Sequence, residues 1–589
     1  MKSASQKRRL LAAACIALPL LAACGGDGNG KSPAPAPAPS VSPVLKSTTY
    51  GQVEGVDSSA TSGTYSWKGI PFAKPPVGDL RWKAPVDPDA WTTAKAAKEY
   101  GNACAQYGRI YGPGTNNRYD ETIGTTLNQA VGSEDCLYLN IWRPATTDTN
   151  LPVIVFFHGG SNVSGYTADP VYDGANLAKA ANAVVITPNF RLGILGFLAV
   201  PQLKTGTDAA TDSGNFAILD SIKALQFINK NIASFGGNPA NVTIMGQSAG
   251  AINVYALMTS PMMVAANPKL FHKVVPMSGG LSLASNLPAG SIPTMSPATT
   301  YDLQGTTLLQ QLVIADNLAV DTATANAYIA GRSATQIAEY MRSKTPAVLF
   351  NTLLTRLPAL AGSGPIPEGT AVPTDAIAAI NAGNYVKAPV MAGNTRDEGK
   401  LFPSFLPLVG GAANARIVSD AQLFSTQLNY NPEAAPAISI SDWIHASYLP
   451  VNTPTTGFTA RAHQLNTVFF LASRDNILDA LKAKQSEVWY YQFNWDKQPA
   501  PWNDIYGAAH LFDLPFMFGN FGPSLMSNIM NTNANRGGRL ALSDTMMKSL
   551  GAFAKNGNPN DAALGVTWNA WPQKLIFDAT LTDKAISVQ

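Results

Sequence analysis

The chain has 589 residues, a formal net charge of +3 at pH 7, 13% charged residues and 46% hydrophobic residues. So small a net charge excludes the basic surface that nucleic-acid binding needs, and it favours an uncharged partner. Beyond the N-terminus, no run of about eighteen apolar residues indicates a membrane-spanning helix. The composition is typical of a globular protein.

The N-terminus has the layout of a secretory signal, in which four basic residues precede an apolar run over residues 10–23. The run ends in Leu21-Ala22-Ala23-Cys24, which resembles a bacterial lipobox, where Cys24 becomes the lipidated first residue. Residues 25–43 are Gly, Ser, Pro and Ala in the main and cannot form a core. We therefore predict a lipoprotein-type signal peptide over residues 1–23, a tether over 24–46 and one folded domain over 47–589.

This prediction places the protein outside the cytoplasm, in the periplasm or at the cell surface, anchored to a bacterial membrane through Cys24. The alternative is an ordinary cleaved signal that happens to contain a cysteine, since small residues also suit the ordinary peptidase.

Four cysteines are present, of which Cys15 lies in the signal and Cys24 is assigned to the lipid. The remaining Cys104 and Cys136 most economically form one disulfide in an oxidising compartment, closing a loop that contributes about 3 kcal/mol on the chain-entropy model. A metal site is the weaker interpretation, because no CxxC spacing occurs and neither cysteine has a histidine nearby. No metal site is predicted.

Uniformly apolar segments alternate with helical patterns in the middle of the chain. Residues 71–82 are too rich in proline for an interior strand and predict an ordered surface loop. Strands are predicted over 151–157 and 183–187, and later over 273–278, 389–393 and 488–495. Between them, apolar residues spaced by three and four over 218–232 predict an amphipathic helix. This alternation indicates the α/β class, with a mostly parallel sheet covered by helices on both faces.

Residues 285–385 differ from the rest, because they are rich in Ala, Thr, Leu and Gln and have no strand pattern. We expect them to form helices and loops inserted over the carboxyl edge of the sheet, where they would shape a substrate pocket.

The strongest local signal is G-x-S-x-G at Gly246 to Gly250, which follows an apolar strand and precedes a helical segment. A strand packed closely on the next helix leaves no room for side chains beside the turn, so small residues are needed two before and two after Ser248. This context predicts a nucleophile elbow with Ser248 at its apex; the alternative is a plain structural turn.

A serine nucleophile needs a histidine base and a third group that orients the base. The chain has five histidines, His158, His272, His445, His463 and His510. The order serine, acid, histidine of α/β-hydrolases selects His510, the last of them. The acid is expected in Asn394-Thr395-Arg396-Asp397-Glu398-Gly399, which follows a predicted strand. Asp397 and Glu398 are chemically equivalent candidates, and a solvated acidic turn is the alternative.

The chain resembles the type-B carboxylesterases, a family that includes bacterial p-nitrobenzyl esterases, cholinesterases and the noncatalytic neuroligins. The resemblance covers nearly all of the chain beyond the tether. Its most specific motifs are Ser133-Glu134-Asp135-Cys136-Leu137-Tyr138-Leu139-Asn140, Pro75-Pro76-Val77-Gly78 and Phe235-Gly236-Gly237-Asn238-Pro239. It implies the α/β-hydrolase fold.

The resemblance also implies roles for individual residues. Glu398, in the pattern D-E-G, would be the acid, and Cys104 with Cys136 the early disulfide. Gly160, Ser161 and Ala249 fall at the positions whose backbone N–H groups form the oxyanion hole, and Ser278 matches a buried serine close to the acid and histidine.

The sequence departs from the family pattern near the nucleophile. Ser161 stands where a third glycine or alanine is usual, Asn162 where an aromatic is usual, and Gln247 where glutamate is frequent.

We therefore predict an exported serine esterase that transfers an acyl group to water through Ser248, His510 and Glu398, with no metal or organic cofactor. The alternatives are a lipase for insoluble lipid and a noncatalytic neuroligin-like binding protein. Cholinesterases bind a cation on a tryptophan of the disulfide loop, helped by the glutamate that precedes the nucleophile. This chain has Tyr107, Tyr111 and Tyr119 in that loop but no tryptophan, and it has the neutral Gln247 in place of the glutamate. Neutral short-chain alkyl or aryl esters are the predicted substrates.

Overall fold

A computed structural model describes residues 42–589. The predicted signal peptide (1–23), the predicted lipidation site Cys24 and the greater part of the predicted tether lie outside these residues. Within residues 42–589, no helix is both long enough and apolar enough to cross a membrane.

The ordered domain begins slightly earlier than the sequence suggests. Strand β1 (Leu45–Thr48) starts inside the predicted tether and pairs antiparallel with β2 (Gly51–Glu54). The carbonyl of Val44, a residue only 7% exposed, accepts a hydrogen bond of 2.7 Å from Trp67 Nε1. The predicted boundary between residues 46 and 47 therefore moves to a point before Val44, because buried partners fix the chain there.

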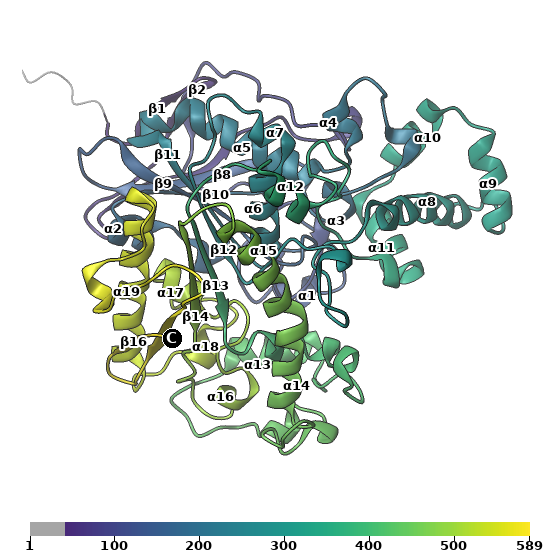
Figure 1. Cartoon of the computed structure of the whole chain (residues 1–589). Helices are drawn as coiled ribbons and strands as arrows, with labels where there is room; N and C mark the ends of the chain where they lie inside the picture. The colour runs from purple at the N-terminus through teal and green to yellow at the C-terminus, as the bar shows by residue number, and fades with distance from the viewer. Residues whose placement is uncertain (1–41) are drawn as a thin grey trace, which may run out of the picture. The chain divides into compact units, whose positions relative to one another are not determined.

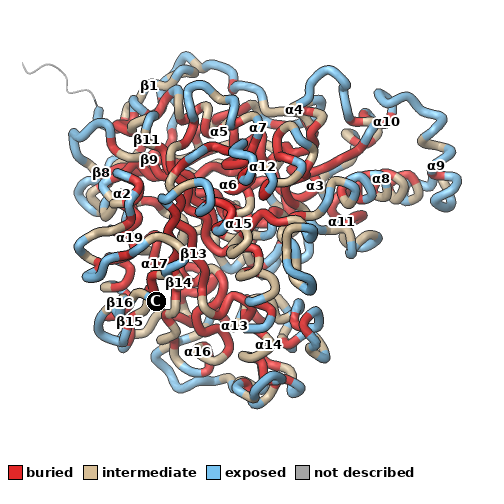
Figure 2. The backbone as a smooth tube through the Cα atoms, viewed as in Figure 1, coloured by how far each residue is buried: buried red, intermediate tan, exposed pale blue. Residues whose placement is uncertain are grey.

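An eleven-stranded sheet forms the centre of the domain. Its strands run through the interior of the domain (Figure 1), where the backbone is largely buried (Figure 2). Its strands, in order across the sheet, are β16 (Lys584–Val588), β15 (Leu575–Ala579), β14 (Val488–Phe493), β13 (Val390–Thr395), β12 (Lys273–Met277), β11 (Gly237–Gln247), β9 (Leu151–Phe157), β10 (Val184–Pro188), β8 (Tyr138–Pro144), β4 (Thr64–Pro71) and β3 (Val56–Ser58). The run from β15 to β10 is parallel throughout, while β16 at one edge and β8, β4 and β3 at the other are antiparallel. The predicted mostly parallel sheet is confirmed.

Both faces of the sheet are buried, which explains why its central strands are uniformly apolar. On β9, Val153, Val155 and Phe157 belong to one core cluster, and Ile154 and Phe156 to another. Successive side chains of a strand point to opposite faces, so each face has its own core.

Helices cover the two faces separately (Figure 1). One core includes α5 (Phe216–Asn231), α6 (Ala249–Thr259), α12 (Ala376–Ala382) and α15 (Ala472–Lys482). The other includes α2 (Ala175–Ala181), α17 (Leu514–Phe518) and α19 (Arg536–Asn556). The predicted arrangement of helices on both faces is confirmed.

Four helices of the predicted insertion form a separate packed group. They are α8 (Ala298–Ala315), α9 (Thr322–Ala330), α10 (Ala334–Arg342) and α11 (Pro346–Arg356). Their core includes Ile194 and Leu195 of α3 (Gly193–Gly196). The last helix of the predicted range, α12, belongs instead to the sheet covering, because Ile377 and Ile380 pack in the main core. The insertion is therefore shorter than expected.

A second group of short elements follows β13; apart from its first turn, which carries the candidate acid Glu398, the sequence did not indicate it. These are η7 (Glu398–Leu401), η8 (Pro403–Val409), α13 (Asp420–Asn429), η9 (Ile440–Asp442), η10 (Ala446–Tyr448), α14 (Phe458–Leu465) and the π-helical turn η11 (Asn466–Leu471). Short 3-10 turns with interspersed prolines give little periodicity, which is why the sequence did not reveal them.

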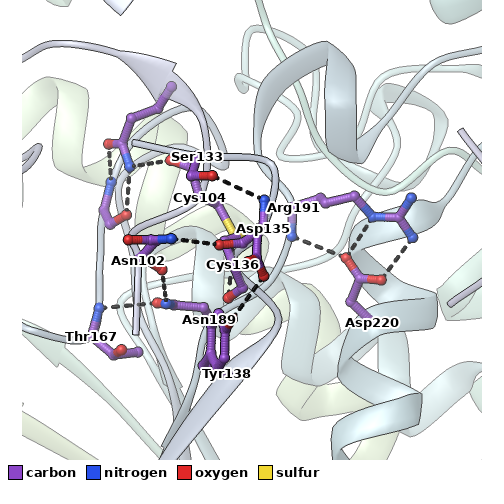
Figure 3. The surroundings of a disulfide bond; sticks show 12 residues. Asn102, Cys104, Ser133, Asp135, Cys136, Tyr138, Thr167, Asn189, Arg191 and Asp220 are labelled. Atoms are coloured by element: carbon purple, nitrogen blue, oxygen red, sulfur yellow. Dashed lines mark hydrogen bonds and ion pairs between the residues drawn. A yellow bond between two sulfur atoms is a disulfide. The ribbon is translucent and has the colours of Figure 1, made fainter. Parts of the chain in front are cut away.

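The expected disulfide between Cys104 and Cys136 is present, and Figure 3 shows its surroundings. Side-chain amides connect it to the sheet: Asn102 Nδ2 donates to Asp135 O at 3.1 Å, and Asn189 Nδ2 donates to Asn102 O at 2.9 Å. Such bonds satisfy the buried backbone polar groups of the loop. The disulfide thus belongs to a network that includes the end of β10.

Two of the family-like motifs meet beside this disulfide. Arg81, in the proline-rich loop, donates from Nε to Glu134 Oε1 at 2.6 Å, and its Nη2 contacts the other carboxylate oxygen. Nearby, Arg191 makes a bidentate pair with Asp220 at 2.8 and 2.7 Å (Figure 3). Bidentate pairs of this kind fix geometry, because both partners lose their rotational freedom together.

Candidate active site

Ser248 lies between β11 and α6 in a backbone conformation that side chains rarely adopt, with φ of 58° and ψ of −124°. A Cβ at Gly246 would lie 2.2 Å from Gly250 O, and one at Gly250 would lie 2.1 Å from Phe157 O. The glycines are therefore required by the close approach of strand and helix, as the sequence predicted. The turn directs Ser248 away from the core, at the carboxyl end of a central strand.

Glu398 and His510 come together although 112 positions separate them. His510 Nδ1 and Glu398 Oε2 are 2.5 Å apart, and both side chains are buried. The other oxygen of Glu398 accepts hydrogen bonds of 2.9 Å from Asn394 Nδ2 and from the Thr395 backbone N–H at the end of β13. These donors fix the carboxylate, and the carboxylate holds the proton of the imidazole on Nδ1.

Asp397, the other candidate acid, contacts a different set of groups. It lies 2% exposed and accepts hydrogen bonds from Arg396 at 2.7 Å and from the backbone N–H of Ala508 at 2.9 Å. Its second oxygen lies 2.7 Å from His463 Nε2. Asp397 therefore fastens the loop that carries His510 and does not contact the imidazole of His510 itself.

Ser248 and His510 line the same cavity, yet Ser248 Oγ makes no hydrogen bond to any residue between 42 and 589. The free nitrogen of the imidazole, Nε2, instead lies 3.0 Å from the side-chain nitrogen of Gln247. With the proton on Nδ1, Nε2 presents a lone pair, which accepts from the amide N–H of Gln247. Catalytic hydrogen bonds are often formed only when substrate is bound.

Backbone N–H groups without partners in the described chain lie beside Ser248. The Gly160 and Ser161 N–H groups donate no hydrogen bond within the described chain, and Ala249 is the first residue of α6, where N–H groups have no intrahelical acceptor. Gly160 and Ser161 line a cavity together with Ser248. Gly160 is partly buried and Ser161 is exposed, so these N–H groups are open to an anion that enters the cavity.

Asn162 forms a reciprocal pair with Asn253 on α6, the helix that begins beside Ser248. Asn253 Nδ2 donates to Asn162 Oδ1 at 2.8 Å, and Asn162 Nδ2 donates to Asn253 Oδ1 at 3.2 Å, with both residues buried. Asn162 and Ser161 both have φ of 57°, a conformation that asparagine tolerates better than an aromatic residue. Asn162, which departs from the family pattern, thus joins the loop of Gly160 to α6.

Two further side chains hold the ends of this loop. His158 Nδ1 donates to Gly159 O at 2.8 Å, and burial lowers the pKa of His158 to about 4, which keeps the ring neutral. At the other end, Gln106 Nε2 donates to Gly165 O and its Oε1 accepts from Gly165 N, each at 2.9 Å. Gln106 follows Cys104 closely, so the disulfide loop helps to position the loop beside Ser248.

Ser278 and Asp513 are buried near the same residues. Ser278 Oγ makes no hydrogen bond to Glu398, to His510 or to any other residue of the described chain. Asp513 accepts a hydrogen bond of 2.8 Å from Tyr491 OH, and burial, together with the charge of Glu398, raises the pKa of Asp513 to about 7. Ser278 therefore lines the site without orienting the acid or the histidine directly.

Two cavities, each of about 320 Å³, meet at Ser248. Cavity 1 includes His510, Gln247 and Tyr111 of the disulfide loop in its wall. Cavity 2 includes Ala249, Ser278 and residues of the inserted helix α8. Ser161, Phe402 and Phe405 also line both cavities.

Many residues of the cavity walls come from segments that the sequence did not indicate. Cavity 1 is lined by Arg416, Leu423, Trp443 and Phe458 from the short elements after β13, and cavity 2 by Phe469 and Phe470. Only the dense phenylalanines that follow D-E-G could have indicated this lining. Within residues 42–589, no group of three or more His, Cys, Asp or Glu side chains is placed to hold a metal ion.

The sheet order, the strained serine turn and the carboxylate–histidine pair together define an α/β-hydrolase. A profile of the carboxylesterase family matches residues 42–577. The para-nitrobenzyl esterase of Bacillus subtilis (strain 168) is 31% identical over 543 residues, covering 91% of this chain and 95% of the relative. The fumonisin B1 esterase of Sphingopyxis macrogoltabida is 30% identical over 532 residues, covering 90% and 84%.

A solved structure of a PNB esterase aligns with a TM-score of 0.68 at 27% identity, covering 92% of this chain and 97% of that chain. The chain belongs to the carboxylesterase family. It is a carboxylic ester hydrolase, and the serine type is typical of this family.

The lowered pKa of Asp397 implies that the free energy of unfolding depends on pH. Burial by itself raises the pKa of Asp397, but the hydrogen bonds and charges of His463, Lys400 and Arg396 outweigh it and hold the pKa well below its usual range. A carboxylate with a lowered pKa stabilises the fold above the unfolded pKa of about 4, and this contribution is lost as the pH falls.

We expect Asp397→Asn to lower the free energy of unfolding by about 3 kcal/mol at pH 7, because it removes a buried negative charge that Arg396, Lys400 and His463 stabilise. The difference from the unmodified protein should shrink as the pH falls below about 4. Denaturant unfolding at several pH values measures it, with the exposed Asp302→Asn as the control. Equal losses at pH 7 and at low pH would contradict this account.

Proposed function

We propose that Ser248, His510 and Glu398 form the catalytic triad of this esterase. The observation that supports it best is the contact between Glu398 and His510 Nδ1, which leaves Nε2 as a lone pair at the wall of the cavity that also holds Ser248. An imidazole in this tautomer can take a proton from a serine hydroxyl. The amide of Gln247 must release Nε2 when substrate brings Ser248 Oγ into hydrogen-bond range.

In the proposed reaction, Ser248 Oγ attacks the ester carbonyl and His510 takes its proton. The carbonyl oxygen becomes an anion that accepts hydrogen bonds from the N–H groups of Gly160, Ser161 and Ala249, each worth about 3 kcal/mol in comparable sites. His510 then gives the proton to the leaving alcohol. Water repeats the sequence on the acyl-enzyme, releasing the acid and restoring Ser248.

The position of His510 suggests which part of the ester enters which cavity. His510 lines cavity 1 and does not line cavity 2. Because His510 must reach the oxygen of the leaving alcohol, we assign the alcohol to cavity 1. The acyl group then lies on the other side of the scissile bond, in cavity 2.

Cavity 1 favours a neutral alcohol. Its charged side chains are largely paired: Arg416 contacts Asp420 at 2.5 Å, and Lys400 Nζ donates to Asp504 O at 2.9 Å. Burial raises the pKa of Asp169 to about 6, which weakens any negative potential there at mildly acidic pH. The disulfide loop contributes tyrosine and no tryptophan, and Gln247 is uncharged. We propose short-chain alkyl or aryl esters of neutral alcohols as substrates.

The triad assignment predicts a distinct pattern of losses. Ser248→Ala should leave a folded protein with kcat/KM reduced at least about a thousandfold, because the other groups act through the nucleophile. Glu398→Gln should be severe as well, because the amide no longer fixes the tautomer of His510. Asp397→Asn should cost little kcat in protein shown to be folded. A larger kcat loss in Asp397→Asn than in Glu398→Gln would make the acid assignment wrong.

The alcohol assignment predicts the response to charge. The kcat/KM for a choline ester should not exceed that for its uncharged isostere of equal size, because no carboxylate stands before the nucleophile. Gln247→Glu should move the ratio toward the choline ester. A tenfold preference of the unmodified protein for the choline ester would overturn the proposal for neutral alcohols.

We also propose that the esterase is exported and carries a lipid on Cys24, on the basis of the apolar run that ends in Leu21-Ala22-Ala23-Cys24. Expressed with its own leader in a bacterium, the protein should sediment with membranes and incorporate labelled fatty acid. Cys24→Ser should abolish the labelling while leaving ester hydrolysis intact. Labelling that persists in Cys24→Ser would refute the anchor.

A further inference from the structure

Cavity 2 contains hydrogen-bonding groups that the protein itself does not satisfy. Gln304 of α8 is 2% exposed and donates from Nε2 to Leu360 O and, at 2.9 Å, to Gly362 O. Two carbonyl acceptors fix the orientation of the amide, because only its nitrogen can donate to them. The oxygen Oε1 therefore points away from both carbonyls, and it accepts no hydrogen bond from any residue of the described chain.

Other polar groups of the same cavity lack partners. Within residues 42–589, Ser363 Oγ and Ser278 Oγ are buried without a hydrogen bond, and Tyr301 OH, which lines the cavity, makes none. Burial raises the pKa of Tyr301, so its hydroxyl keeps its proton and remains a donor. Tyr301 and Gln304 are three positions apart on α8, so both belong to one face of the helix.

A buried acceptor without a partner costs free energy of folding, and native structures rarely keep one. Gln304 Oε1, Ser363 Oγ and Ser278 Oγ are three such groups around one cavity, which Ser248 also lines, and they indicate that a bound molecule supplies the partners. A partner for Gln304 Oε1 must be a donor, whereas Tyr301 and Ser363 can donate or accept. A hydroxyl group satisfies both requirements at once.

The rest of the lining restricts the kind of molecule. None of the residues that line cavity 2 is charged, so an ionised acyl group would be buried there without a counter-charge. One wall consists of phenylalanine rings, with Phe469 and Phe470 at 4.6 Å and Phe402 and Phe470 at 5.5 Å between ring centroids. Such rings favour a flat aromatic group by stacking and edge contacts.

We propose that cavity 2 selects a neutral aromatic acyl group that carries a hydroxyl on its ring, with the hydroxyl donating to Gln304 Oε1 and accepting from Tyr301 OH. This inference rests on the proposed function, because it requires the acyl group of Ser248 to occupy cavity 2. In this proposal, Gln304 and Tyr301 determine the specificity for the acyl group.

The test compares esters that share one alcohol and differ only in the acyl ring. The methyl esters of cinnamic, 3-hydroxycinnamic and 4-hydroxycinnamic acid are hydrolysed by the unmodified protein, and each kcat/KM is divided by the rate of alkaline hydrolysis to remove intrinsic reactivity. At least one hydroxylated ester should exceed the unsubstituted ester by about tenfold or more, because the unsubstituted ring leaves the buried oxygen of Gln304 unpaired.

Gln304→Met keeps the size of the side chain and removes the acceptor, so the preference should fall to about twofold or less. Tyr301→Phe should reduce it too, and this variant keeps the test valid if Gln304→Met fails to fold. The matched control is Gln310→Met on the same helix, where Gln310 pairs with Asn326 at the surface and the preference should persist. A general packing defect would lower all three esters together and leave their ratio unchanged.

Equal rates for the three esters in the unmodified protein would overturn the proposal, as would a preference that survives both Gln304→Met and Tyr301→Phe. Hydrolysis of 4-nitrophenyl acetate serves as the reporter of the esterase itself. If this ester is hydrolysed and Ser248→Ala abolishes the reaction while the acyl preference is absent, the triad stands and only the acyl assignment fails. If Ser248→Ala retains activity, the proposed triad is wrong, and the acyl proposal that rests on it is wrong as well.

Discussion

The close contact between β11 and α6 is the constraint on which the site depends. No side chain fits at Gly246 or Gly250, because a Cβ at either position would meet backbone about 2 Å away. The chain turns there with Ser248 at a positive φ of 58°, so the hydroxyl leaves the core and the first N–H of α6 remains without an acceptor. One packing requirement thus places the proposed nucleophile and part of the proposed oxyanion hole together at the carboxyl end of the sheet.

Two adjacent carboxylates make different contacts around His510, one with its imidazole and one with its loop. Glu398 contacts the imidazole, and its own orientation comes from donors at the end of β13. Asp397 holds the backbone of the His510 loop through Ala508 and pairs with Arg396. Successive residues point in different directions, so one carboxylate reaches the imidazole of His510 while its neighbour fixes the loop that carries it. The D-E-G pattern therefore places the proposed orienting acid next to a residue that anchors the His510 loop.

The departures from the family pattern fit together around the nucleophile. Asn162 and Asn253 tie the loop of Gly160 to α6, and Gln106 ties the end of that loop to the disulfide region. Gln247 contacts Nε2 of His510 through a neutral amide. Polar contacts of this kind specify geometry because each partner is buried and must find its complement. The cavity beside α8, which we propose for the acyl group, is likewise lined by uncharged residues, among them several phenylalanines.

The sequence alone determined the fold class and the strand and helix on either side of Ser248, because these depend on local periodicity and on glycines at fixed offsets. It also determined the disulfide and the short set of candidate histidines and acids, because few residues of each kind are available. It left Asp397 and Glu398 equivalent on chemical grounds. Only the tertiary structure showed which carboxylate touches His510, that Asn162 pairs with Asn253, and that residues 401–471 line the cavities. Those outcomes depend on contacts between residues about 90 or more positions apart, and on short irregular turns, which leave no periodic signal in the chain.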